Sequence, residues 1–288
     1  MASKNPLIAP VLKWVGGKRQ LLEQIRPFIP SKFSTYYEPF VGGGAVLFDL
    51  APKKAIINDF NSELINVYLM IKEKPEELID LLENHKRLNS EEYYYSVREL
   101  DRNKEEYEKL SNLEKASRII YLNKTCFNGL FRVNSSGEFN SPWGKYKNPN
   151  ITCDTTIRAL HKYFSEKDVT ILTGDYESSL NTVTKKDFVY FDPPYMPISN
   201  SSSFTGYTSN GFGKEEQERL KRVCDKLNEK GVRFLQSNSD CDFIKELYSD
   251  YKVYEVDAKR LINADAKKRG EIKEVLICNY EFDKKEDC

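Results

Sequence analysis

The residues best suited to chemistry form the octapeptide FVYFDPPY, residues 188–195. A hydrophobic run leads directly into Asp192, two prolines and Tyr195. Pro193 and Pro194 cannot donate to a sheet ladder and have a fixed φ, so a strand must end there. One interpretation is a rigid turn in which Asp192 is a local hydrogen-bond acceptor. The other is a preset pocket that holds a carboxylate, backbone carbonyls and an aromatic ring at the carboxyl end of a strand, where open α/β sheets bind ligands.

A second stretch, EPFVGGGAVLFDL at residues 38–50, places Gly42 to Gly44 between a predicted strand and a predicted helix. Such a turn lets a nucleotide-like ligand approach backbone amides. The glycine spacing does not match the dinucleotide fingerprint, so NAD is not expected. Asp59 follows the next predicted strand, as the ribose-binding acid of such folds does. The alternative role for Asp59 is the N-cap of the helix that follows it.

The stretch LKWVGGKRQLL, residues 12–22, fails as a phosphate-binding P-loop, because Arg19 stands where Ser or Thr must hold magnesium. It still suits a ligand with an adenine ring and a carboxylate. Trp14 offers a stacking face, and Lys13 and Lys18 offer point charges. The alternative is a core tryptophan beside a turn.

The elements that must position these residues alternate between strand and helix. Short apolar segments predict strands at residues 36–40, 55–58, 169–173, 187–191, 232–237, 252–256 and 274–280. Helical patterns occur at residues 18–28, 60–71, 214–229 and 240–247. This alternation predicts an α/β fold with a doubly wound, largely parallel sheet.

The strand signal disappears between the strands predicted at 55–58 and 169–173. Helices are predicted there near residues 75–84, 90–110, 113–124 and 154–165. We therefore predict one domain formed by residues 1–72 and 166–288, into which a mainly helical domain of residues 73–165 is inserted.

Composition limits the class of protein. The 288 residues include 44 basic and 44 acidic side chains, and 31% are charged. The longest apolar runs span only a few residues, so we expect a soluble, cytoplasmic protein without a membrane segment or signal peptide. The six cysteines form no C-x-x-C pair and there are two histidines, so we expect no metal site and reduced thiols.

The charge is unevenly distributed along the chain. Residues 1–32 contain six Lys or Arg and one acid, and residues 118–147 contain five Lys or Arg and one acid. Residues 73–116 contain 13 acids and eight bases. This pattern indicates a side that faces a polyanion. Ordinary solvated charge runs are the alternative.

Five motifs occur in order over nearly the whole chain: KWVGGK, EPFVGGGA, INDFN, NGLFRVNSSGEFNSPWGKY and DPPY. Together they resemble the Dam-type DNA N6-adenine methyltransferases of the alpha class, most of all the GATC-specific methylases of DpnII-type restriction-modification systems. DPPY alone also occurs in RNA and other amino methyltransferases, whereas the five motifs together are specific. The resemblance implies a Rossmann-like methyltransferase sheet, with residues 73–165 as target recognition domain and double-stranded DNA as partner. It implies a prokaryotic cell or a phage-infected host as the source and leaves the oligomeric state open.

The resemblance also implies site residues. The cofactor S-adenosylmethionine would be contacted by Trp14, Lys18, Phe40, Gly42, Gly44, Asp59, Asp175, Tyr176 and Asp192. Lys13 would read the first guanine of GATC, and Arg132 would bind the second guanine. Phe127 and Asn128 would enter the base stack, and Leu130 and Pro142 would contact the thymine. Lys145 or Lys147 is expected to contact only a phosphate.

The DPPY tetrad, Asp192 to Tyr195, would then be catalytic. The exocyclic nitrogen of adenine is a poor nucleophile because its lone pair is delocalised into the ring. Hydrogen bonds to the Asp192 carboxylate and the Pro193 carbonyl would localise that lone pair for in-line attack on the sulfonium methyl, without a covalent enzyme intermediate or a metal. Tyr195 would stack on the base, which must first be flipped out of the duplex.

Two other classes of function remain as alternatives. A methyltransferase acting on RNA or on a protein amide would share the pocket but would have no use for NGLFRVNSSGEFNSPWGKYK. A non-enzymatic DNA-binding module would need no DPPY tetrad.

Overall fold

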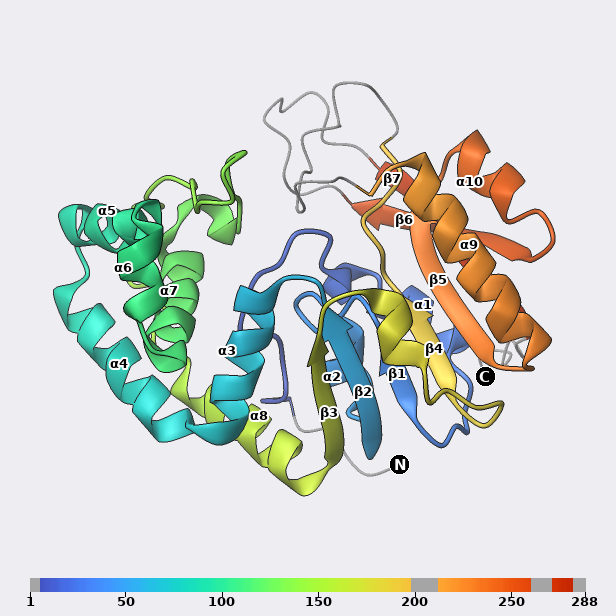
Figure 1. The fold of residues 1–288 in the computed structure, drawn as a ribbon, viewed down its shortest axis with the longest axis horizontal. Coiled ribbons are helices and arrows are strands. Elements are labelled where there is room, and N and C mark those ends of the chain that lie inside the picture. The colour runs from blue at the N-terminus through green and yellow to red at the C-terminus, as the bar shows by residue number, and fades with distance from the viewer. Residues whose placement is uncertain (1–5, 198–211, 260–270, 282–288) are drawn as a thin grey trace. The chain divides into compact units, whose positions relative to one another are not determined.

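The computed structural model describes residues 6–197, 212–259 and 271–281 (Figure 1). In these residues the strands form one seven-stranded sheet of order β3-β2-β1-β4-β5-β7-β6. Their bounds are β1 Tyr36–Glu38, β2 Lys54–Asp59, β3 Asp168–Thr173, β4 Phe188–Phe191, β5 Arg233–Ser239, β6 Lys252–Lys259 and β7 Glu271–Cys278. β1 pairs in parallel with β2 and β4, and β4 pairs in parallel with β5. β7 runs antiparallel to both β5 and β6. The predicted α/β fold with a largely parallel sheet is therefore confirmed.

The strands that carry the site are short and buried. All four residues of β4 are buried, and so are the three residues of β1. Both strands end before a proline: Pro39 comes directly after β1, and Pro193 follows Asp192 after β4. Since proline cannot donate a backbone hydrogen bond to a sheet, the prolines in the sequence determine where β1 and β4 end.

The longer helices lie at α3 Ser62–Glu73, α4 Pro75–Leu88, α5 Glu91–Glu99, α7 Asn112–Thr125, α8 Asp154–Glu166 and α9 Lys214–Glu229. The shorter ones are α1 Leu22–Ile25, α2 Ala45–Leu50, α6 Lys104–Lys109 and α10 Asp242–Leu247. Single 3₁₀ turns are η1 Lys18–Gln20, η2 Arg26–Phe28, η3 Leu100–Arg102, η4 Phe127–Gly129 and η5 Tyr176–Leu180. No helix in the described residues has both the length and the apolar composition needed to cross a membrane.

Two predicted helices are interrupted. The helix predicted at residues 18–28 is broken into η1, α1 and η2, and Pro27, within η2, has no backbone N–H to donate. The helix predicted at residues 90–110 is divided by η3. There Asn103 caps α6 by accepting a hydrogen bond from the Glu106 N–H at 3.3 Å.

The chain divides into two compact units. Unit 1 comprises Met1–Gly17, Val41–Lys53 and Asn58–Gly174, and unit 2 comprises Lys18–Phe40, Lys54–Ile57 and Asp175–Cys288. Unit 1 contains α2 to α8. In unit 2, α9 packs against β5 (Figure 1). An apolar cluster that includes Phe191 and Phe234 forms the core of this unit. The domain boundaries predicted above are a separate division of the chain and stay a prediction.

Candidate active site and recognition surface

The DPPY stretch lies at the point where the strand order reverses. β2 lies on one side of β1, and β4 followed by β5 lies on the other. The register pairs Tyr36 with Phe188 and Tyr37 with Val189. Open α/β sheets bind ligands outside the carboxyl ends of the two strands that flank such a reversal. In unit 2 these ends lead into Phe40 and into Asp192.

The two oxygens of the Asp192 carboxylate have different surroundings. Oδ1 lies 2.8 Å from Lys18 Nζ and accepts a hydrogen bond from Ser237 Oγ at 2.9 Å. In the described part of the chain, neither Asp192 Oδ2 nor the Pro193 carbonyl oxygen has a hydrogen-bond partner. Burial raises the pKa of Asp192, while the Lys18 charge and the Ser237 hydrogen bond act in the opposite direction.

Four buried polar side chains support this stretch, and we call them the β5 cradle: Gln217, Ser237, Asn238 and Ser239. Gln217 Nε2 donates to the Pro194 carbonyl at 2.9 Å, and Asn238 Nδ2 donates to Gln217 Oε1 at 3.0 Å. Beyond Tyr195, the Met196 N–H donates to Asn238 Oδ1 at 3.3 Å. The Met196 carbonyl accepts from Ser239 Oγ at 2.7 Å. The cradle thus fixes the backbone on the carboxyl side of Pro193.

The Tyr195 ring is also held in place. Its hydroxyl donates to Glu274 Oε2 at 2.6 Å, and Lys18 Nζ lies 4.5 Å from the ring centroid. Burial, with the Asp192 and Glu274 charges, raises the pKa of Tyr195, which therefore stays a neutral hydrogen-bond donor. One lysine thus contacts both ends of the DPPY tetrad.

Unit 2 also contains Phe40, Asp175 and Tyr176, which were predicted to contact the cofactor. The rings of Phe40 and Tyr176 lie 4.8 Å apart. Asp175 receives two hydrogen bonds from Arg219, at 2.7 and 2.8 Å, which lower its pKa. The Arg219 guanidinium lies 4.8 Å from the Tyr176 ring.

Asp59, in unit 1, organises the glycine turn. Its Oδ2 accepts from the Gly42 N–H at 2.9 Å, and its Oδ1 accepts from the Asn61 N–H at 2.9 Å. The N-cap of α3 is Asn61, whose side chain accepts from the Leu64 N–H at 3.0 Å. The alternative that Asp59 caps this helix is therefore wrong, because the chain turns two residues later than that interpretation requires.

Trp14, also in unit 1, is half-buried and packs on both the glycine turn and Phe131. Its ring is stacked on Phe131 with centroids 4.6 Å apart. A Cβ at Gly42 would lie 3.1 Å from the Trp14 ring, and φ at Gly42 is 47°. Glycine is required at this position both by the backbone and by the packing of Trp14.

The residues predicted to bind DNA are joined by short contacts within unit 1. The Phe127 N–H donates to the Pro142 carbonyl at 2.8 Å, and Phe127 is 55% exposed. Asn128 has a positive φ of 58°. The Lys13 backbone exchanges two hydrogen bonds, each 2.9 Å, with the Asn123 side chain. Lys13 is thereby held at the start of the segment that carries Phe127.

The remaining predicted contacts lie on the same segment. Arg132 is exposed, and its Nε donates to Asn140 Oδ1 at 2.7 Å. Leu130 accepts a hydrogen bond from Ser141 Oγ at its carbonyl oxygen. Lys145 is exposed and has a positive φ of 55°.

Two basic residues counted toward the polyanion-facing side do not belong there. Arg118 is only 2% exposed and pairs with Asp101 inside unit 1. Lys18 is 4% exposed and pairs with Asp192 inside unit 2. No group of three or more His, Cys, Asp or Glu side chains that could hold a metal ion occurs in the described ranges.

Comparison with known proteins identifies the family. The profile of the D12 class N6 adenine-specific DNA methyltransferases matches residues 14–262. The chain belongs to this family. It is 46% identical to the Type II methyltransferase M1.LlaDCHI of Lactococcus lactis subsp. cremoris over 97% of the chain and 99% of that protein. It is 41% identical to the Type II methyltransferase M.MjaIII of Methanocaldococcus jannaschii, over 95% of the chain and 99% of that protein.

A third relative of this D12-class methyltransferase is the DNA adenine methylase of Escherichia coli K12, 33% identical over 92% of the chain and 93% of that protein. The methyltransferase is thus an adenine-specific DNA methyltransferase, and enzymes of this family take the methyl group from S-adenosylmethionine. A solved structure of a precorrin 8W decarboxylase is 14% identical with a TM-score of 0.36, which is too distant to carry an argument.

The side chains of the methyltransferase fit the parts of this cofactor. In unit 1 the Asp59 carboxylate is an acceptor, the type of group that binds ribose hydroxyls, and backbone N–H groups of Gly42 and Asn61 hold it in place. In unit 2 the rings of Phe40 and Tyr176 offer apolar surface for an adenine.

Sequence reasoning missed the β5 cradle of the methyltransferase. The signal was present as Ser237-Asn238-Ser239 at the end of a predicted strand, where three small polar residues replace the apolar run. Gln217 gave no signal, because a glutamine in a charged helix is ordinarily exposed.

Proposed function

We propose that this methyltransferase transfers the methyl group of S-adenosylmethionine to N6 of an adenine that is flipped out of double-stranded DNA, within the sequence GATC. The five motifs support the target sequence through their resemblance to GATC methylases. The names of two relatives, which are Type II methyltransferases, support a role in protecting DNA from a cognate restriction enzyme. Marking of DNA in the cytoplasm of a prokaryotic or phage-infected cell is the second role that the family supports.

The observation that carries the catalytic proposal is the distribution of acceptors in DPPY. Lys18 and Ser237 occupy Asp192 Oδ1, and Gln217 occupies the Pro194 carbonyl. Asp192 Oδ2 and the Pro193 carbonyl oxygen are left as acceptors in the described residues. An adenine amino group has two N–H bonds, so it can donate to both of these oxygens at once.

Each group of the chain has one task in this scheme. Asp192 Oδ2 and the Pro193 carbonyl accept the two amino hydrogens, which favours a tetrahedral nitrogen with a localised lone pair. The negative charge of Asp192 stabilises the positive charge that develops on the nitrogen. Pro194 fixes the backbone between them, and the Tyr195 ring stacks on the base. The cofactor supplies an electrophilic sulfonium methyl group.

For the cofactor, we assign Asp59 to the ribose hydroxyls and Asp175 with Tyr176 to the adenine. Lys18 and Trp14 are assigned to the same ligand. The turn containing Gly42 and Gly44, together with Phe40, completes the proposed set. The resemblance of the motifs supports these roles.

For DNA, we assign residues 73–165 to target recognition. Arg132 reads the second guanine through paired hydrogen bonds, the commonest specific contact in the major groove. Lys13 reads the first guanine, and Lys145 anchors a phosphate.

Four other residues of the same segment are assigned to the bases. Phe127 and Asn128 fill the space left by the flipped adenine, which offsets part of the unstacking cost of a few kcal/mol. Leu130 and Pro142 contact the thymine methyl group. The Phe127 side chain is 55% exposed, so its ring is accessible to a base stack, which supports this assignment.

Incubation with isotope-labelled cofactor tests the proposal. The chain is given, separately, duplex DNA with GATC sites, the same DNA with each site altered, structured RNA and an unrelated protein. We expect label only in the GATC duplex, at adenine. Label in RNA or protein, or equal label in the altered DNA, would contradict the proposed substrate.

A further inference from the structure

A short break between helices holds one residue of the recognition segment by its backbone. η3 separates α5 from α6 and carries Asp101 and Arg102. The Phe139 N–H donates to Asp101 Oδ2 at 2.8 Å, and the Phe139 carbonyl accepts from Arg102 Nη2 at 2.7 Å. Both polar backbone groups of one residue are therefore bound by two adjacent side chains.

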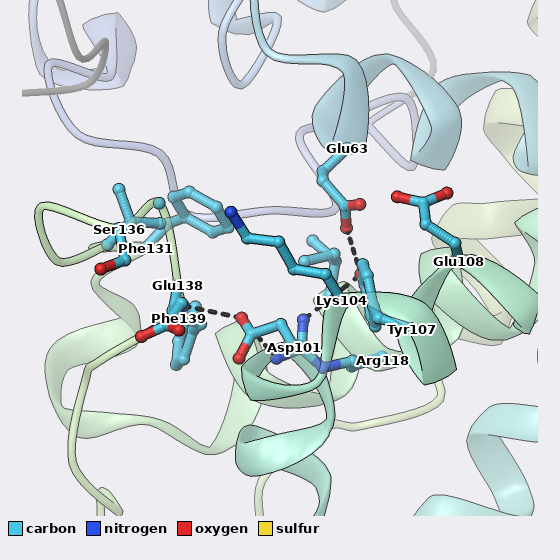
Figure 2. Close-up of a pocket in the computed structure, with 13 residues that line it drawn as sticks. Glu63, Asp101, Lys104, Tyr107, Glu108, Arg118, Phe131, Ser136, Glu138 and Phe139 are labelled. Carbon is cyan, nitrogen blue, oxygen red and sulfur yellow. Dashed lines mark hydrogen bonds and ion pairs between the residues drawn. The ribbon is translucent and has the colours of Figure 1, made fainter.

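Asp101 forms an ion pair with Arg118 of α7, which fixes its carboxylate. Arg118, Asp101 and Phe139 line a cavity of about 200 Å³. Figure 2 shows these three side chains close together. Arg118 Nη2 lies 2.8 Å from Asp101 Oδ2, and the two side chains are 3% and 12% exposed. Arg118 also donates to the carbonyls of Val97 and Arg98, at 3.0 and 2.8 Å. The end of α5, η3 and α7 thus form one rigid base.

Asn140, the residue after Phe139, connects this fixed backbone to Arg132 through hydrogen bonds. Asn140 follows Phe139 directly, and its N–H donates to the Arg132 carbonyl at 2.9 Å. In return, Arg132 Nε donates to Asn140 Oδ1 at 2.7 Å. An isolated antiparallel bridge between Val133 and Phe139 joins the same two stretches of backbone. The position of the Arg132 guanidinium therefore depends on where Phe139 is held.

We propose that Asp101, Arg102 and Arg118 form a clamp that sets the position of Arg132 for base reading, a role that rests on the proposed function of Arg132. A buried ion pair contributes little net stability compared with apolar residues of the same volume, so stability alone is a weak reason for it. Paired hydrogen bonds to a base need the guanidinium within about 0.5 Å and 10–20° of its ideal position. The clamp supplies that restraint without touching DNA, so its members are positioning residues.

The test compares variants that open the clamp with one that does not. Asp101→Asn removes the charge but keeps an acceptor for the Phe139 N–H. The double variant Asp101→Leu with Arg118→Met removes both buried charges, so that neither is left unpaired. Glu76→Gln is the control, because it loses one partner of an exposed ion pair with Arg158 in the same unit, at 2.9 Å.

The assay is kcat/KM for methylation of the cognate site and of sites altered one base pair at a time, with Arg132→Ala measured beside the clamp variants. Thermal unfolding shows whether each variant is folded, and calorimetry without DNA gives its cofactor affinity. We expect the double variant to lose about tenfold or more in discrimination at the single base pair that Arg132→Ala relaxes, with other positions and cofactor affinity unchanged. Asp101→Asn should show a smaller loss at the same position, and Glu76→Gln none.

Three results would overturn the clamp. Full discrimination at that base pair in a folded double variant would do so while leaving the role of Arg132 intact. An equal loss at every site would show that the ion pair serves only the general structure of the unit. If Arg132→Ala itself weakened every site alike, the proposed role of Arg132 would fail, and the clamp would fail with it.

Discussion

Replacement of Gln217 by leucine removes the central member of the β5 cradle. Gln217 is fully buried and joins the Pro194 carbonyl, at 2.9 Å, to Asn238 Nδ2, at 3.0 Å. Leucine has a similar volume but can make neither hydrogen bond. One carbonyl and one amide N–H then lose a partner, and each unsatisfied buried group costs about 1–3 kcal/mol. We expect the free energy of unfolding to fall by roughly 2–6 kcal/mol.

The catalytic effect follows from the position of Pro194. Its carbonyl is one residue from the proposed acceptor on Pro193, so release of Pro194 lets that acceptor move. A displacement of about 1 Å can cost about 100-fold in rate. We therefore expect kcat of Gln217→Leu to fall by about 10- to 100-fold at a temperature where the variant is folded, with the cofactor dissociation constant little changed.

A second variant distinguishes positioning from general destabilisation. In Gln217→Glu, only the protonated acid can donate to the Pro194 carbonyl, while Asn238 Nδ2 keeps its acceptor. The ratio of kcat for this variant to kcat for the wild type should therefore rise as the pH falls. The assay is kcat measured from initial rates over a range of pH, with circular dichroism to verify folding. A folded Gln217→Leu variant with wild-type kcat, or a ratio for Gln217→Glu that is independent of pH, would show that the hydrogen bond from Gln217 does not position the Pro193 carbonyl.

Three further predictions concern the cofactor, pH and DNA. Asp59→Ala should raise the cofactor dissociation constant about tenfold or more, since a charged hydrogen bond contributes about 1.5–3 kcal/mol; unchanged calorimetric binding would contradict its role. The Lys18 charge lowers the pKa of Asp192, so Lys18→Met should raise that pKa and move the acid limb of kcat, at saturating cofactor, to higher pH; a limb that stays or moves down would contradict this. Arg132→Ala should lose about 1–3 kcal/mol of discrimination at one base pair, measured by competition binding. Lys145→Ala should instead weaken all sequences alike and reduce the salt slope by about one, and a site-specific effect of Lys145→Ala would reverse this assignment.

The two strands that carry the site, β1 and β4, were predictable from the sequence because they are buried along their whole length and end before prolines. The apolar run Phe188 to Phe191 followed by Asp192-Pro193 defines both the strand and its end. Hydrophobic runs of this kind report burial directly, and the predicted seven strands correspond to β1 to β7. The position of Asp192 at the carboxyl end of β4 followed from the same pattern.

Contacts between residues distant in sequence could not be predicted in this way. Arg118 reads as one more surface charge, since no local pattern reveals that Asp101 faces it from η3. The local sequence allows Asp59 to be a helix cap, but one of its oxygens accepts a hydrogen bond from the Gly42 N–H, 17 residues away along the chain. Gln217 is polar on a charged helix, and its buried position depends on Asn238. Each of these roles is set by tertiary packing rather than by local propensity.

The most direct measurement of the central claim is nucleoside analysis by mass spectrometry of duplex DNA treated with the wild type and with Asp192→Ala. We expect N6-methyladenine after treatment with the wild type. We expect none above background with Asp192→Ala, although that variant should fold and bind the same DNA, because the carboxylate acts on the amino group rather than on phosphates. Near-normal methylation by Asp192→Ala, or wild-type methylation of a base other than adenine, would contradict the proposed role of Asp192.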